Sequence, residues 1–496
     1  MSLVVDPDLI GALRADLQAA QFTVTHLSEL LGPVAAGALQ RDQMVPAELH
    51  TRGNADPAAI LLRLFTLGDP VDEREVAAAL PRLGSAGAAA LGLVRASGDA
   101  LVATCDLRPY GDEQHDWWVA SDLSEVATRA PLLPEHVLGI GGASTTLAAW
   151  TPRPRARRAL DLGTGCGVQA LHLGAHVEHV VATDISAPAL AYAAFNAALN
   201  EQDWELRAGS LLEPVAGERF DLIVSNPPFV ITPRVAELPV YEYRDAGARG
   251  DAVVEHLVTT LGEHLEPGGI AQLLGNWEIA AGADWRDRVG AWARAAGVDV
   301  WVVQREVQDP AQYAETWARD GGHRSGTAEF AQMYAAWLAD FAARDVAAVG
   351  FGIVTLHRPA TQREPFIDLT EARGPVATPM GPAILAGIEA RVWLAEHGDD
   401  DVLATAWSVA PDITVAHHFR AGASDPTVIR LTQGGGLGRT EDLDTASAAY
   451  VSVADGELTA RVALAAIAGL LDVDQDALIA DLLPRLRRWI ADGILR

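Results

Sequence analysis

Between residues 131 and 360, short apolar runs alternate with longer segments in which apolar residues recur every three or four positions. The short runs predict buried strands, and the longer segments predict amphipathic helices, such as those at 187–199 and 251–264. Strands that alternate with helices form a parallel sheet covered by helices on both faces. We therefore predict an α/β, doubly wound, Rossmann-like domain over 131–360. Its seven-stranded sheet would take strands from 158–162, 179–184, 204–208, 220–225, 269–274, 298–303 and 350–357, with extra helices at 309–345.

The segments on either side of this domain follow a different pattern. Residues 1–130 hold several helical patterns and then a strand-like run at 91–107 with a turn at Ser97-Gly98-Asp99. Helices closed by a hairpin follow the order of a winged-helix unit, so we predict an N-terminal winged-helix-like α+β domain. Prolines and glycines at 358–382 indicate an exit linker. Residues 361–496, which end in an amphipathic helix at 478–490, are predicted to form a second winged-helix-like α+β domain.

Composition narrows the class of protein. The chain has 496 residues, and its 37 basic residues, all arginine, against 66 acidic ones give a net charge of −29. This charge repels phosphate at long range and disfavours nonspecific binding to duplex DNA. Two cysteines exclude a disulfide scaffold and a cysteine-rich metal site. We find no signal peptide and no membrane span, so we expect a cytoplasmic protein, and the arginine-rich, lysine-free composition favours a bacterial source.

Three glycines follow the first predicted strand. Asp161 ends the apolar run, and Gly163, Gly165 and Gly167 precede a predicted helix. Glycines let a backbone turn sharply and approach a ligand closely. Dinucleotide enzymes use the spacing G-x-G-x-x-G, whereas this loop reads G-x-G-x-G with an acid two residues ahead of the first glycine. Both details favour S-adenosylmethionine, whose methionine ammonium would pair with Asp161.

A second acid, Asp184, ends the next predicted strand about 20 residues after Gly163. A carboxylate at this place can accept hydrogen bonds from both ribose hydroxyls of an adenosyl group. The two features lie in register on adjacent strands, and together they predict a ligand site rather than a structural turn.

The fourth predicted strand runs into Asn226-Pro227-Pro228-Phe229. With this loop, residues 135–305 resemble the class I S-adenosylmethionine-dependent methyltransferases that methylate a planar nitrogen, which include nucleobase-amine and release-factor glutamine methyltransferases. Ser210 stands where such enzymes often place an acid facing the adenine, so backbone groups or Glu213 are expected to share that contact. The resemblance implies S-adenosyl-L-methionine as cofactor, held by Asp161, Gly163, Thr164, Gly165, Gly167, Asp184, Ile185, Ser210, Leu211 and Asn226.

The Asn-Pro-Pro-Phe loop suits a particular reaction. An amide or arylamine nitrogen is a poor nucleophile because its lone pair is delocalised. If the Asn226 side-chain oxygen and the Pro227 carbonyl each accept one N–H, the lone pair points at the methyl group. Pro227 and Pro228 stiffen the loop, and Phe229 can stack on a base or cover an amide. We predict these four residues as the catalytic set, with no strong general base, because the sulfonium loses its charge as the methyl moves.

Further residues are candidates for contact with the substrate. The segment 241–251 is dense in charge and glycine and follows the loop closely, so it could fold back over the substrate mouth. We expect Arg244, Asp245 and Arg249 there. Trp277, at the end of the fifth strand, is a further candidate for the site, and the alternative place for its side chain is the apolar core. We expect no metal site, because the adjacent histidines His417 and His418 have no third ligand at a suitable spacing.

Together these patterns predict an N-methyltransferase. The first expectation for the acceptor is the exocyclic amine of an RNA or other nucleobase, and the alternatives are a protein glutamine or peptide group and then a small metabolite. A cofactor-binding scaffold without activity is the non-enzyme alternative. Arginines cluster at 153–158 and 485–488. A mouth ringed by 153–158 and Arg244 would favour RNA, whereas an acidic mouth would favour a protein or small molecule.

Overall fold

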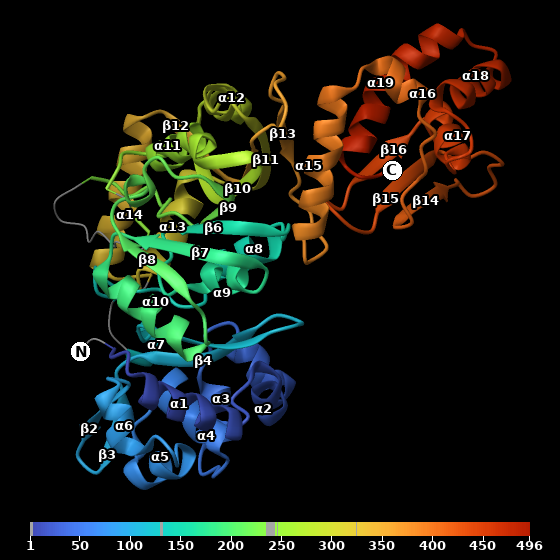
Figure 1. The fold of residues 1–496 in the computed structure, drawn as a ribbon. Helices are drawn as coiled ribbons and strands as arrows, with labels where there is room; N and C mark the ends of the chain where they lie inside the picture. Colours follow the sequence, from blue (N-terminus) through green and yellow to red (C-terminus); the bar gives the residue numbers. More distant parts are fainter. Residues whose placement is uncertain (1–2, 129–131, 235–243, 246, 324) are drawn as a thin grey trace.

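The structure is a computed structural model that describes residues 3–128, 132–234, 244–245, 247–323 and 325–496. Figure 1 shows an N-terminal segment against one side of a central α/β domain and a C-terminal unit beside its far edge. Among the described residues, no helix is both long and apolar enough to cross a membrane.

The central sheet has eight strands in the order β13-β11-β12-β10-β9-β6-β7-β8. Strands β6 to β11 run parallel to one another, and β12 runs antiparallel between β10 and β11. The bounds are β6 (Ala156–Leu162), β7 (Val177–Asp184), β8 (Trp204–Ala208), β9 (Phe220–Ser225), β10 (Leu265–Ala280), β11 (Asp299–Gln308), β12 (Val346–His357) and β13 (Ile367–Glu371). All seven predicted strands are present.

The sheet has one strand more than predicted, and the additional strand lies at one edge, in the segment predicted as a linker. β13 comes from the segment interpreted as an exit linker, and it pairs in parallel with β11. The prolines and glycines on either side of β13 are typical of a linker, and the strand itself has only five residues. It forms because one edge of β11 is otherwise unpaired. The sheet thus extends beyond residue 360.

Helices cover both faces of the sheet, which confirms the doubly wound architecture. Neighbouring residues on β6 point to opposite faces, so Ala159 joins one apolar core and Leu160 the other. The first core is covered by α8 (Gly142–Trp150), α9 (Val168–Gly174) and α10 (Ala187–Leu199), and the second by α11 (Ala252–Thr260) and α12 (Trp285–Ala295). Short 3₁₀ turns lie at Glu213–Val215 and Leu261–His264.

The predicted helices between the last two strands are present as α13 (Pro310–Asp320) and α14 (Ala328–Ala343). Asp309 begins α13 with a capping box completed by Gln312, and Pro310 takes the first helical position, where its missing N–H costs nothing. The pair has its own apolar core, which includes Tyr313, Trp337 and Ile231. α13 and α14 therefore pack on the chain that follows the Asn-Pro-Pro-Phe loop.

The N-terminal segment has two small sheets, in the orders β1-β3-β2 and β4-β5. Its residues Leu13 and Phe22 belong to the same apolar core as Phe195 of α10. Whether it is a winged-helix unit stays a prediction, and the predicted boundary at 130/131 lies outside the described residues. Its elements are α1 (Pro7–Ala19), α2 (Val24–Leu39), α3 (Val45–Thr51), α4 (Pro57–Leu61), a π-helical turn (Leu62–Thr66), β1 (Val71–Asp72), α5 (Glu73–Ala79), α6 (Gly84–Ala90), β2 (Val94–Ser97), β3 (Ala100–Ala103), β4 (Asp106–Gly111), β5 (Asp116–Ser121) and α7 (Glu125–Thr128).

The C-terminal unit has a separate apolar core and a three-stranded sheet, β14-β15-β16. Asp368 of β13 joins it to the central sheet through ion pairs to Arg391 (2.7 Å) and Arg488 (3.0 Å). Its winged-helix assignment also stays a prediction. The elements are α15 (Gly381–Glu396), α16 (Asp399–Ala404), β14 (Ile413–His418), β15 (Val428–Gln433), β16 (Thr440–Leu443), α17 (Thr445–Val453), α18 (Ala460–Leu471) and α19 (Gln475–Ala491).

Candidate functional site

A cavity of about 590 Å³ lies where β6, β7, β8 and β9 end. The carboxyl ends of parallel strands meet at one edge of a sheet, which is where ligands bind in open α/β folds. The cavity is lined by the glycine loop, the residues that follow β7, β8 and β9, residues 136–139, and the start of α11. It brings together most of the residues that the sequence predicts for cofactor and substrate.

Two of the three glycines shape the cavity. Gly163 (φ +75°) and Gly165 (φ +55°) line it in the left-handed region, and a Cβ added to either would meet no atom within 4 Å. Side chains there would project into free space beside the backbone. Gly167 (φ +92°) does not line the cavity, and a Cβ there would come within 2.6 Å of the Trp204 ring. The absence of a side chain at position 167 therefore allows α9 to pack closely on β8, and it does not serve contact with a ligand.

Asp161 lies beneath the loop, not in the cavity wall. Its side chain is fully buried, and Oδ2 accepts hydrogen bonds from Thr164 Oγ1 (2.7 Å) and the Ala170 N–H (3.0 Å). Burial raises the pKa of Asp161 to about 7, and Thr164 and Ala170 oppose this shift. Direct contact of Asp161 with a methionine ammonium stays a prediction; in the structure its Oδ2 holds the loop together, while Thr164 lines the cavity.

Asp184 ties the ends of β6 and β7 together at the cavity wall. Its Oδ2 accepts from the Gly165 N–H (2.8 Å), and its Oδ1 accepts from the Ser186 N–H (2.9 Å). Burial raises the pKa of Asp184, and these backbone donors partly offset the shift. Ile185 is 69% exposed at the rim. The carboxylate thus lies where the sequence predicts a ribose contact.

Ser210 and Leu211 also line the cavity, after β8. The Gly209 N–H donates to the Asp184 carbonyl (3.0 Å), which seats this turn beside β7. Leu211 has φ +44°, an uncommon left-handed conformation for a leucine. Glu213, the predicted alternative for the adenine contact, does not line the cavity.

The Asn-Pro-Pro-Phe loop borders the same cavity. Ser225 ends β9 and donates from Oγ to the Leu162 carbonyl (2.8 Å), which joins the ends of β9 and β6. Asn226, Pro227 and Pro228 line the cavity, but Phe229 does not. The Phe229 ring instead meets the Trp317 ring of α13 edge to face, with centroids 6.2 Å apart.

The predicted substrate residues divide into those beside the loop and those away from it. Asp245 forms an antiparallel bridge with Phe229 and lines the cavity. Arg244 is buried and pairs with Asp320 (2.9 Å), so it does not face the cavity. Arg249 is exposed and is not among the lining residues. The chain does return to the loop at 244–245, whereas Tyr241, Glu242, Tyr243 and Ala246 lie outside the described residues.

Of the two places predicted for the Trp277 side chain, the structure shows the apolar core and not the substrate site. Its side chain is fully buried in the second apolar core and donates from Nε1 to Gln304 Oε1 (2.8 Å). The ring lies over Gly350 and Gly352 of β12, where a Cβ on either glycine would collide with it. Two glycines on the neighbouring strand thus make room for a core tryptophan.

Several lining residues have no motif in the sequence. His136, Val137, Leu138 and Gly139 form one wall, and His256 of α11 forms part of another. Ser144 of α8 also lines the cavity, and its carbonyl accepts from Gln169 Nε2 (2.8 Å). Ser144 lies in a glycine- and hydroxyl-rich run at 141–147, whereas residues 136–139 and His256 carry no comparable pattern in the sequence.

Comparisons with known proteins agree with this geometry. Residues 139–296 match the family "Methyltransferase small domain", and residues 19–104 match "Domain of unknown function (DUF7059)". The fold, the cavity and this match identify the central part of the chain as a class I S-adenosylmethionine-dependent methyltransferase domain, with S-adenosylmethionine as its cofactor.

The curated proteins that the chain resembles include glutamine methyltransferases and a ribosomal RNA methyltransferase. A release factor glutamine methyltransferase of Geobacter sulfurreducens is 35% identical over 30% of this chain and 54% of its own length. A ribosomal protein uL3 glutamine methyltransferase of Bradyrhizobium diazoefficiens is 37% identical over 28% of this chain and 46% of its length. A ribosomal RNA small subunit methyltransferase C of Alcanivorax borkumensis is 29% identical over 25% and 33%. The chain spans about half the length of the first relatives it matches.

Among solved structures, a 16S rRNA N2 G1207 methyltransferase of T. thermophilus aligns with a TM-score of 0.29 at 16% identity. That alignment covers 62% of this chain and 69% of the other. The likeness is too slight for a functional comparison.

Proposed function

We propose that this protein transfers a methyl group from S-adenosylmethionine to a planar amide or amine nitrogen. The observation that carries the proposal is that Asn226, Pro227 and Pro228 line the same cavity as the glycine loop and Asp184. A cofactor loop and a pair of carbonyl acceptors at one cavity are what methylation of a weakly nucleophilic nitrogen requires.

The residues of this chain fit the cofactor. Gly163 and Gly165 leave open space beside their backbone, and Asp184 presents a carboxylate for the two ribose hydroxyls. Ser210 and Leu211 would border the adenine. Asp161 acts through Thr164 and the loop. When bound, S-adenosylmethionine supplies an electrophilic sulfonium methyl group.

Asn226 and Pro227 would hold the acceptor nitrogen. If the Asn226 side-chain oxygen and the Pro227 carbonyl each accept one N–H, the lone pair is turned out of conjugation and toward the methyl group. The C–S bond breaks as the C–N bond forms, and the nitrogen then releases one proton to water. Because positioning supplies the rate enhancement, no strong base is needed beside the nitrogen.

We propose a glutamine side chain of a protein as the acceptor. No arginine is among the described residues that line the cavity. The arginines of 153–158 lie before and at the start of β6, at the opposite end of this strand from the glycine loop, and Arg244 is buried in an ion pair with Asp320. The ring of arginines that would have favoured RNA is therefore not found at the described cavity, and glutamine methyltransferases are among the relatives that are 35% identical or more.

A nucleobase amine is the second candidate, because one observation favours it. Phe229 and Trp317 form an aromatic pair next to Asn226-Pro227-Pro228, and such a surface can stack on a base that has been turned out of its strand. The ribosomal RNA methyltransferase among the relatives also supports this alternative.

Transfer of a labelled methyl group distinguishes the candidates. The full chain and labelled S-adenosylmethionine are added to a cell extract from which endogenous S-adenosylmethionine has been removed, and protein and RNA are then separated, hydrolysed and identified by mass spectrometry. Methylated glutamine supports the first candidate, and a nucleoside methylated on its exocyclic amine supports the second. Cofactor binding without transfer into any fraction would contradict the proposed activity and favour the scaffold alternative.

A further inference from the structure

Asn196 of α10 is a fully buried side chain that joins two segments far apart in the sequence. Its Oδ1 accepts from the Ala120 N–H (2.8 Å), and its Nδ2 donates to the Ala120 carbonyl (2.8 Å). The same Nδ2 also donates to the Cys166 carbonyl (2.8 Å). Ala120 belongs to β5 of the N-terminal segment, and Cys166 belongs to the glycine loop.

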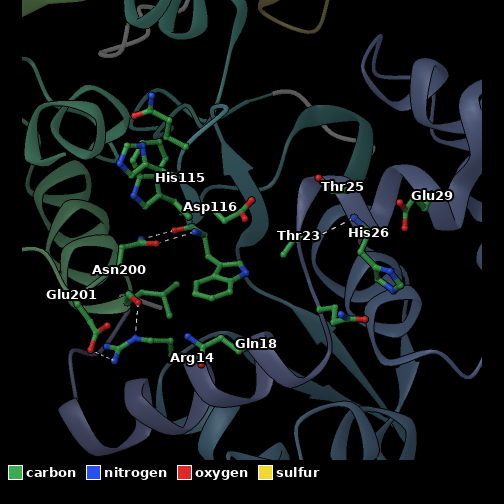
Figure 2. A pocket seen from close by; sticks show the side chains of 15 residues that line it. Arg14, Gln18, Thr23, Thr25, His26, Glu29, His115, Asp116, Asn200 and Glu201 are labelled. Carbon is green, nitrogen blue, oxygen red and sulfur yellow. Dashed lines mark hydrogen bonds and ion pairs between the residues drawn. The ribbon is translucent and has the colours of Figure 1, made fainter. Parts of the chain in front are cut away.

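Asn200, one helical turn further along the chain, makes the corresponding contacts with β5 but not with the loop. Its Oδ1 accepts from the Trp118 N–H (2.9 Å), and its Nδ2 donates to the Trp118 carbonyl (2.8 Å) and to the Asn196 carbonyl (2.8 Å). Figure 2 shows Asn200 beside the hairpin that carries His115 and Asp116, with Arg14 and Glu201 nearby.

The spacing of these contacts follows from helix and strand geometry. Four residues of helix advance about 6 Å, and two residues of strand advance about 6.6 Å. Asn196 of α10 and its C-cap residue Asn200 therefore match Ala120 and Trp118 of β5, with helix and strand running in opposite directions. Two asparagine side chains take the place of a neighbouring strand along the outer edge of β5.

Of the two segments that Asn196 joins, the glycine loop lines the cofactor cavity, and β5 leads to residues that hold another of its walls. Cys166 lines it directly and donates from Sγ to the Leu138 carbonyl (3.3 Å). β5 leads to Asp122, whose Oδ2 accepts from the Val137 N–H (2.8 Å) and whose Oδ1 accepts from Tyr192 Oη of α10 (2.7 Å). Val137 and Leu138 line the cavity. The helix α10 thus holds the glycine loop and the wall at 136–139 together.

We propose that Asn196 is a positioning residue for the cofactor, and that its own hydrogen bonds couple cofactor binding to the backbone of β5 at Ala120. The N-terminal segment is then part of the cofactor site without touching the cofactor. This inference rests on the proposed function only in taking S-adenosylmethionine as the ligand of the cavity.

Asn196→Ala and Asn200→Ala form a matched pair. Each leaves one buried N–H and one buried carbonyl of β5 without a side-chain partner, so each costs stability. Only Asn196→Ala also releases the Cys166 carbonyl of the glycine loop. A structural role alone would lower the melting temperature of both variants and leave their cofactor affinities equal.

The test is calorimetry with S-adenosylmethionine on the full chain and both variants. We expect Asn196→Ala to weaken binding about tenfold and Asn200→Ala by less than about twofold. In the transfer assay, the KM for S-adenosylmethionine should rise in Asn196→Ala while kcat at saturation is kept. Equal affinities in the two variants would overturn the inference and leave the proposed function standing, whereas no binding by the unmodified chain would overturn both.

Hydrogen exchange on the unmodified protein tests the same coupling should Asn196→Ala fail to fold. Binding of S-adenosylmethionine should slow exchange in a peptide that covers 116–122, although these residues do not line the cavity. A peptide that covers 94–103, in the distant β2–β3 hairpin, should be unchanged. Unchanged exchange at 116–122 in protein that binds the cofactor would contradict the inference.

Discussion

Tyr313→Phe tests whether the helical pair α13–α14 positions the catalytic loop. Tyr313 is fully buried, and its Oη accepts hydrogen bonds from the Ile231 N–H (2.7 Å) and from Asn276 Nδ2 (3.0 Å). Trp337 Nε1 donates to the Ile231 carbonyl (2.7 Å). Ile231 lies two residues after Phe229, so side chains from α13 and α14 hold both backbone groups of a residue just beyond the loop.

The expected magnitudes follow from these contacts. Removal of the hydroxyl leaves two buried donors unpaired, at about 1–3 kcal/mol each, so the free energy of unfolding should fall by about 2–6 kcal/mol. A shift of the loop of about 1 Å would reduce kcat about 100-fold. The affinity for S-adenosylmethionine should stay within about twofold, because neither Tyr313 nor Ile231 lines the cavity.

The assay combines chemical denaturation, calorimetry with S-adenosylmethionine, and transfer rates at saturating cofactor. Tyr334→Phe is the matched control, because Tyr334 lies on α14, is half-buried and makes no hydrogen bond to Ile231. A Tyr313→Phe variant that loses stability but keeps its kcat would refute the positioning argument.

Substitutions at two glycines and at Asp161 separate the roles of the loop residues. Gly163→Ala puts a Cβ into the open space of the cavity at a left-handed φ, so S-adenosylmethionine should bind at least about tenfold more weakly by calorimetry. Gly167→Ala collides with the Trp204 ring instead, and it should lower the free energy of unfolding by about 1–3 kcal/mol. Equal effects of the two glycine variants on binding would contradict this distinction. Asp161 has a pKa raised to about 7, above its unfolded value, so the folded state binds its proton more tightly. The contribution of Asp161 to the free energy of unfolding should therefore be complete below about pH 4 and fall by on the order of 4 kcal/mol as the pH rises to about 7. Chemical denaturation of Asp161→Asn should show a free energy of unfolding that depends less on pH across this range.

The parts of the site that the sequence predicts are those determined by local pattern. Asp184 and Asn226 end apolar strands, and parallel strands bring their carboxyl ends together, so position along the chain translates directly into position in the cavity. The positions of Gly163 and Gly165 in the cavity can be predicted in the same way, because a sharp glycine turn after a strand leaves backbone that a ligand can approach.

The errors arise where tertiary packing decides the role of a residue. Gly167 belongs to the motif, yet it packs against Trp204 and does not line the cavity. Trp277 lies in the core because Gly350 and Gly352, more than seventy residues later, leave space for it. The glycine motif gives no sign of Trp204, and the sequence around Trp277 gives no sign of Gly350 and Gly352.

The missing parts depend on long-range pairing. β13 becomes a strand only because β11 offers it an open edge. The wall at 136–139 is placed by Asp122, which in turn depends on Tyr192 of α10. No periodicity within 120–140 signals such contacts.

Asn226→Ala tests the central claim most directly. The substitution removes one of the two carbonyl oxygens that would hold the acceptor nitrogen, and it leaves the glycine loop and Asp184 in place. Labelled methyl transfer into the identified acceptor should fall at least about 100-fold, while the affinity for S-adenosylmethionine stays within about threefold. Transfer at the unmodified rate by a variant that still binds S-adenosylmethionine would contradict the account.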